Sequence, residues 1–122
     1  MPRKPTTGPT EREAEILAIL WEAGEADAEE IRQSLTDRPT ANTVRTLLTI
    51  MAKRGLVQDD GKAYGRKFRA RVEQAEVQSS ALRRLMDTFF AGSAEEVILR
   101  LVDEGDVDAD KLKELQKRLR GK

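Results

Sequence analysis

Apolar residues in the first half of the chain recur with a helical period over three segments. The first runs from about Glu11 to Ala23, and a short second one ends near Leu35 and turns Ile31 inward. The third runs from about residue 41 to Arg54, with apolar positions at i, i+3, i+4 and i+7 that are Val44, Leu47, Leu48 and Met51. Three helices joined by short turns predict a helix-turn-helix arrangement.

Residues typical of helix ends stand at the borders of these segments. Thr10 and Asp27 are each followed three residues later by Glu, which is the pattern of a capping box. Ser93 begins a third such pattern further along the chain, and Thr40 is suited to cap the third helix. Gly55 follows that helix, where a left-handed residue commonly ends a helix.

After Gly55 the period changes to that of strands. Residues 56–58 favour a strand, Asp-Asp-Gly-Lys at 59–62 is a turn signal, and residues 64–72 alternate loosely. Phe68, Ala70 and Val72 would share one face, and basic residues would share the other. This pattern predicts a β-hairpin with a basic outer face, and a three-helix unit followed by such a hairpin is a winged helix.

Three further amphipathic helices are predicted beyond residue 73. They cannot bury much of a core alone, so we expect them to pack against a second copy of the chain. The predicted organisation is a flexible N-terminal arm over 1–9, a winged-helix DNA-binding domain over 10–72 and a helical dimerisation domain over 73–122. The expected dimerisation residues are Leu82, Leu85, Phe89, Phe90, Val97, Ile98, Leu101, Leu112, Leu115 and Leu119.

The composition excludes several chemistries. The chain of 122 residues has no Cys and no His, so a disulfide framework, a thiolate nucleophile and a His-based triad or metal site are excluded. We expect no catalytic residue, metal or cofactor. The apolar run over residues 16–21 is too short to span a bilayer, and no signal-type run follows the basic N-terminus. A cytoplasmic location is therefore expected.

The balanced total charge hides a sorted distribution. The chain has 22 basic and 22 acidic residues, which argues against nucleic acid as a partner. From Glu11 to Asp37, however, nine acids stand against two bases, and from Arg38 to Arg71 nine bases stand against two acids. The third helix and the hairpin are thus strongly basic, which is the distribution that a DNA-facing surface requires.

The third helix carries side chains that suit DNA bases on the faces that its apolar stripe does not use. Arg can donate to guanine, Asn can bond adenine, and Thr offers both a hydroxyl and a methyl group. The predicted base-reading residues are Asn42, Thr43, Arg45, Thr46 and Thr49, and the predicted phosphate contacts are Thr40, Lys53, Arg54, Lys62, Arg66, Lys67 and Arg69. A solvated polar face with capping threonines is the simpler interpretation of the same pattern.

Other functions fit the sequence less well. The acids of the first two helices lie mostly in first helical turns, where the helix dipole favours them, so they indicate stability rather than metal binding or acid catalysis. Phe89 and Phe90 suit a dimer core better than a ligand pocket. The main alternative is a winged-helix protein–protein interaction module without sequence-specific DNA binding. A dimeric enzyme ranks third, since no nucleophile–base pair is present.

Several segments together resemble the BlaI/MecI/CopY family of bacterial repressors, the penicillinase repressor family. The segments are Thr10–Trp21, Glu30-Ile31 with Leu35, Thr43–Thr49, Lys53–Val57 and Phe90–Ser93. The resemblance implies a winged-helix homodimer that binds a palindromic operator and represses transcription. It maps the recognition segment of the family onto residues 43–46 and implies a membrane-bound metalloprotease sensor as a possible partner.

The chain departs from the family pattern at four points. Ile50 stands where a basic residue is common, and Phe68-Arg-Ala70 lacks the proline that ends the family's wing. Arg100-Leu101 stands at the position of the Asn-Phe bond that is cleaved in the β-lactam-responsive branch, and the Cys-x-Cys pair of the copper-responsive branch is absent. The inducing signal, the operator and the regulated genes therefore stay open.

Overall fold

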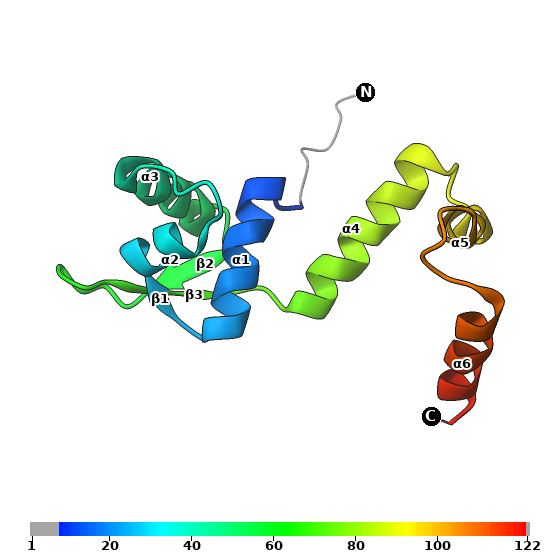
Figure 1. Ribbon diagram of the computed structural model, residues 1–122. Helices are drawn as coiled ribbons and strands as arrows, with labels where there is room; N and C mark the ends of the chain where they lie inside the picture. The colour runs from blue at the N-terminus through cyan, green and yellow to red at the C-terminus, as the bar shows by residue number, and fades with distance from the viewer. Residues whose placement is uncertain (1–7, 122) are drawn as a thin grey trace. The chain divides into compact units, whose positions relative to one another are not determined.

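The first part of the chain builds a small three-helix unit. A computed structural model describes residues 8–121, and contacts divide the chain into one compact unit that ends at Ser80 and another that begins at Ala81. The first unit contains α1 (Glu11–Ala23), α2 (Ala28–Ser34) and α3 (Ala41–Lys53) (Figure 1). All three lie within a residue or two of the helices that the apolar period predicts.

The caps explain why these helices begin where they do. The Thr10 hydroxyl accepts from the N–H of Glu13 at 3.2 Å, and the Glu13 carboxylate accepts from the N–H of Thr10 at 2.9 Å. Asp27 and Glu30 form the same reciprocal pair before α2. At Ser93 the structure shows the hydroxyl accepting from the Glu96 N–H, so one half of the third predicted capping box is present among the described residues.

The hairpin belongs to a three-stranded antiparallel sheet. The strands β1 (Ala26–Asp27), β2 (Val57–Asp59) and β3 (Lys67–Ala70) are arranged in the order β1-β3-β2. The second strand predicted over 64–72 is shorter, because residues 60–66 form the loop. We call β2, this loop and β3 the wing. The sequence missed β1, since two residues are too few to show a period.

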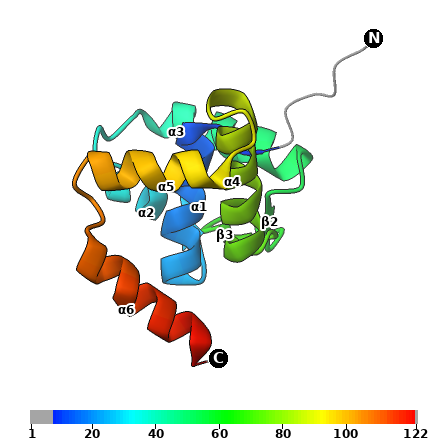
Figure 2. The same cartoon turned by 90° about the vertical axis from the view of Figure 1, so that its right-hand side faces the viewer.

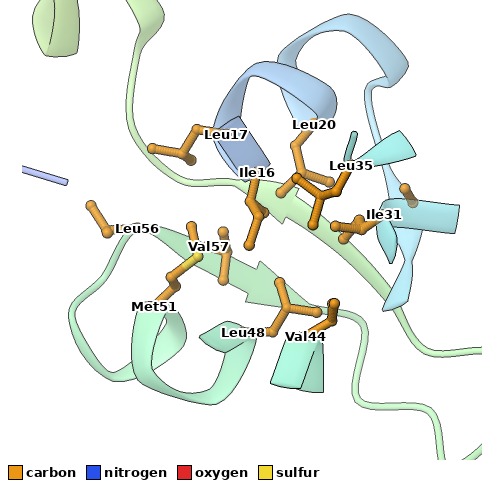
Figure 3. Packing of buried hydrophobic residues seen from close by; sticks show 11 residues of the cluster. Ile16, Leu17, Leu20, Ile31, Leu35, Val44, Leu48, Met51, Leu56 and Val57 are labelled. Atoms are coloured by element: carbon orange, nitrogen blue, oxygen red, sulfur yellow. The ribbon is translucent and has the colours of Figure 1, made fainter. Parts of the chain in front are cut away.

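The core of the first unit lies between its helices and the sheet (Figure 3). The fully buried side chains come from all three helices and from β2, and they are Ile16, Leu17, Leu20, Ile31, Val44, Leu48, Met51 and Val57. The indole Nε1–H of Trp21 donates to the carbonyl of Val72 at 3.0 Å and ties the end of α1 to the chain after β3. The wing is thereby fixed to the helices.

The N-terminal arm predicted over residues 1–9 lies outside the described residues, except for its last two. Of these, Gly8 is buried and its carbonyl accepts a hydrogen bond from Arg54.

The remaining helices are α4 (Gln74–Phe89), which runs through the boundary between the two units, and α5 (Ala94–Asp103) and α6 (Ala109–Arg120), which follow one another as separate helices (Figure 2). None of the described helices combines the length and the apolar character that crossing a bilayer requires. In the second unit Met86 is buried, but most other large apolar side chains are exposed.

Candidate nucleic-acid interface

Helix α3 presents a polar face to solvent. Its apolar stripe is turned into the core, and the five predicted base-reading residues are all exposed. Among the described residues, the side chains of Asn42, Arg45 and Thr46 have no hydrogen bond or ion pair within the chain. Their donors and acceptors are therefore available to a ligand, and their position in the first half of a helix matches that of base-reading residues in helix-turn-helix proteins.

Two threonines of α3 are bonded locally. The hydroxyl of Thr43 lies 2.8 Å from that of Thr40, which itself caps the helix by accepting from the Thr43 N–H. The Thr49 hydroxyl donates to the carbonyl of Arg45 at 2.9 Å. These bonds give a structural reason for threonine at both positions, as the simpler interpretation of the sequence requires. Both residues are nevertheless exposed to solvent.

The bases of strand β3 lie near acids of the same unit. Lys67 Nζ lies 3.0 Å from Glu30, and the Arg69 guanidinium lies 3.8 Å from Glu25. The hydrogen bond to Glu30 raises the pKa of Lys67 above its ordinary value. Both bases are predicted phosphate contacts. A phosphate would have to compete with Glu30 for Lys67, whereas the 3.8 Å contact of Arg69 is weak and leaves its charge accessible.

The bases in the loop of the wing make no close ion pair with an acid among the described residues. Lys62 is exposed and makes no ion pair in the part of the chain that the structure describes. Arg66 donates through Nε to the carbonyl of Lys62 at 2.8 Å, and its other end lies 3.9 Å from Asp59. At that distance the second contact is weak, so the charge of Arg66 remains accessible at the surface.

Two neighbouring bases at the end of α3 have different surroundings. Lys53 is exposed in the last turn, without an ion pair among the described residues. Arg54 instead pairs with the buried carboxylate of Glu13 and donates to the carbonyl of Gly8 at 2.9 Å. Arg54 thus connects the end of α3 to the start of α1. No sequence pattern indicated this pair, because its members are 41 residues apart.

A hollow of about 430 Å³ lies between α3 and the wing. Arg45 and Thr49 line it from α3, and the loop of the wing lines it from the other side. The remaining lining residues come from the start of α2 and the wing and are Asp27, Ala28, Glu29, Ala63, Tyr64, Gly65, Arg66 and Phe68. Two of the predicted base-reading residues therefore share one concave surface with the wing.

Most predicted dimerisation residues lie at the surface of the second half of the chain. The exposed ones are Leu82, Leu85, Phe89, Ile98, Leu101, Leu115 and Leu119, and Phe90, Val97 and Leu112 are half-buried. Leu99 and Val102 are also exposed but were absent from the prediction. Val102 lies on the apolar stripe of this helix together with Val97, Ile98 and Leu101, whereas Leu99 lies outside it, so exposure on α5 extends beyond the stripe.

The three helices and the wing of the first unit form a winged helix-turn-helix. The chain belongs to the penicillinase repressor family, whose sequence model matches residues 9–121. It is similar to the methicillin resistance regulatory protein MecI of Staphylococcus aureus (strain N315), Staphylococcus epidermidis and Mammaliicoccus sciuri. Each is 24% identical over 108 residues, which cover 85% of this chain and 86% of the relative. The family is one of regulators rather than enzymes.

Proposed function

We propose that this repressor binds a palindromic operator as a homodimer and blocks transcription. The observation that carries the proposal is the exposed polar face of α3, on which Asn42, Arg45 and Thr46 are unengaged among the described residues. In this proposal α3 is the recognition helix and enters the major groove, where Arg45 reads a guanine edge. Asn42, Thr43, Thr46 and Thr49 assist the readout.

Phosphates are bound from both sides of the recognition helix. Lys53, at the end of α3, and Lys62 and Arg66, in the wing, are exposed bases that suit this role. Thr40, Arg54, Lys67 and Arg69 were also predicted as phosphate contacts. The close contacts of Thr40, Arg54 and Lys67 within the chain give these three a second role, which is to hold the helix start, the end of α3 and the base of the wing in position. Arg69 is exposed and makes only a weak contact at 3.8 Å, so it remains accessible to a phosphate.

A second copy of the chain is the partner that we propose for the exposed apolar residues of α4, α5 and α6. Phe89 and Leu119 are 73% and 68% exposed, and side chains of this size rarely stay in contact with water over several helices. A two-fold dimer would place two recognition helices in successive major grooves, about 34 Å apart on one face of the DNA.

The proposed site of action is the cytoplasm, where the protein would meet its DNA. A membrane-bound metalloprotease sensor, which the resemblance implies, stays a prediction. The Arg100–Leu101 bond lies inside α5, so a protease would have to unwind this helix locally to cleave it.

Binding to promoter fragments, including the one upstream of the protein's own coding region, tests the proposal. We expect affinity to fall steeply with salt. Arg45→Ala should weaken specific binding by about 1–3 kcal/mol and non-specific binding far less, whereas Lys53→Ala should weaken both alike and reduce the salt slope by about 1. Absence of a shift on every fragment would contradict DNA recognition and favour a protein-interaction module. Equal losses of specific and non-specific binding in Arg45→Ala would contradict base readout by this residue.

A further inference from the structure

The loop of the wing exposes an aromatic residue that is not among the predicted DNA contacts. Tyr64 is 91% exposed and stands between Lys62 and Arg66 in the loop 60–66. A tyrosine combines an apolar ring with a polar tip, which is why it is enriched at interfaces. Such a residue between two exposed bases indicates a contact surface rather than a part of the core.

Local bonds hold the loop on both sides of Tyr64. The carboxylate of Asp59 accepts from the N–H of Gly61 at 2.7 Å, and Arg66 donates to the carbonyl of Lys62 at 2.8 Å. Because these bonds restrict the backbone before binding, less conformational entropy is lost when the ring meets a ligand.

Tyr64 and the recognition helix border the same hollow. Tyr64 lines the hollow between α3 and the wing together with Arg45 and Thr49 (Figure 1 shows both elements). A duplex that contacts Arg45 and Thr49 therefore also approaches the ring.

The charges of the hollow indicate which part of the DNA meets the ring. On the side of α2 the hollow is lined by the acidic residues Asp27 and Glu29. Hydrogen bonds from Arg32 and Gln33 lower the pKa of Glu29 to about 2, so this group is charged at neutral pH. Glu29 is paired with Arg32 at 2.7 Å, which compensates its charge, whereas Asp27 makes no ion pair among the described residues and disfavours a phosphate at this wall. The ring of Tyr64 is neutral and suits the apolar edge of a sugar.

We propose that Tyr64 is a DNA-contacting residue whose ring packs against the deoxyribose edge of one strand, beside the bases that α3 reads. This inference rests on the proposed function and adds a contact to it. The contact is apolar, so it contributes affinity that salt does not screen. It differs in this respect from Lys62, whose contribution is electrostatic.

The test compares three variants of the full chain on a DNA fragment that the unaltered protein retains from genomic DNA. Tyr64→Ala should bind about tenfold more weakly at every salt concentration, which corresponds to about 1.4 kcal/mol. Its salt slope should equal that of the unaltered protein. Tyr64→Phe should bind within about twofold of the unaltered protein, because the ring is kept, and Lys62→Ala should lower the salt slope by about 1.

Two results would overturn the assignment of Tyr64 while leaving the proposed function intact. One is unchanged binding by Tyr64→Ala, and the other is a loss in Tyr64→Phe as large as that in Tyr64→Ala, which would assign the contact to the hydroxyl. If the unaltered protein retains no fragment at all, the proposed function itself fails. Thermal unfolding of the variants checks the fold, which an exposed side chain should leave unchanged.

Discussion

The two units of the chain contain similar amphipathic helices but bury their apolar faces to different extents. In the unit that ends at Ser80, the apolar stripes of α1, α2 and α3 meet each other and the sheet, and Ile16, Leu17 and Val44 are fully buried. In the unit that begins at Ala81, Met86 is buried but most of the other apolar stripe is exposed. An amphipathic pattern thus predicts a helix and its apolar face, but the cover for that face comes from the rest of the fold or from a partner.

The largest effect is expected in the core of the first unit. Ile16→Ala should lower the free energy of unfolding by about 2–5 kcal/mol, because it removes buried methyl groups and leaves a cavity. Urea or thermal unfolding measures the change. Ile50→Ala is the matched control, since Ile50 is 44% exposed on α3, and its effect should stay within about 0.5 kcal/mol. Equal losses in the two variants would contradict the burial that distinguishes them.

A substitution on the exposed apolar face of the second unit should instead weaken dimer association. Phe89→Ala should raise the dimer dissociation constant at least about 30-fold, which corresponds to about 2 kcal/mol, as expected for a large aromatic residue at an interface. Sedimentation at micromolar concentration distinguishes monomer from dimer. A monomeric unaltered protein under these conditions would show that no second copy covers this face.

The neighbouring bases Lys53 and Arg54 at the end of α3 should differ in their effect on stability. Arg54→Ala leaves the buried carboxylate of Glu13 without its partner and should cost about 1–3 kcal/mol of stability. Lys53→Ala, at an exposed position, should change the free energy of unfolding by no more than about 0.5 kcal/mol relative to the unaltered protein. Unfolding curves of the two variants that coincide would argue against a structural role for Arg54.

The smallest effect concerns the pair that holds the wing. The hydrogen bond from the Asp27 N–H, and then the one from Lys67, lower the pKa of Glu30 below its ordinary 4.5. The stabilisation is therefore complete above pH 4.5 and is lost as the pH falls through the lower pKa of the folded state. Below pH 4.5, the melting temperature of Glu30→Gln should fall less steeply with decreasing pH than that of the unaltered protein. If the two melting temperatures fall in parallel, the Glu30 carboxylate does not stabilise the fold.

Local signals were sufficient to predict the helices. Thr10, Asp27 and Thr40 begin helices through hydrogen bonds within three residues, and such short-range contacts can be read directly from the sequence. The two-residue strand β1 was missed because its pairing with β3 depends on residues about 40 positions away. The strand β3 was predicted too long because the loop 60–66 has no regular period that separates it from a strand.

The candidate site was predictable as a surface but not as a set of contacts. The exposed polar face of α3 follows from the position of its apolar stripe. The partners of Arg54, Lys67 and Arg69 could not be predicted, because each acid lies on another element and only the folded chain brings it near. The close pairs of Arg54 and Lys67 separate these two bases, which hold the fold, from the predicted phosphate contacts that remain accessible.

Selection of genomic DNA fragments by the purified full chain tests whether the protein is a dimeric repressor that reads its operator through α3. Such a repressor should retain fragments that share a two-fold symmetric motif, whose half-sites lie about one helical turn apart or at a multiple of it. Fragments retained without a common motif, or none retained above the non-specific background, would contradict a dimeric repressor that reads its operator through α3.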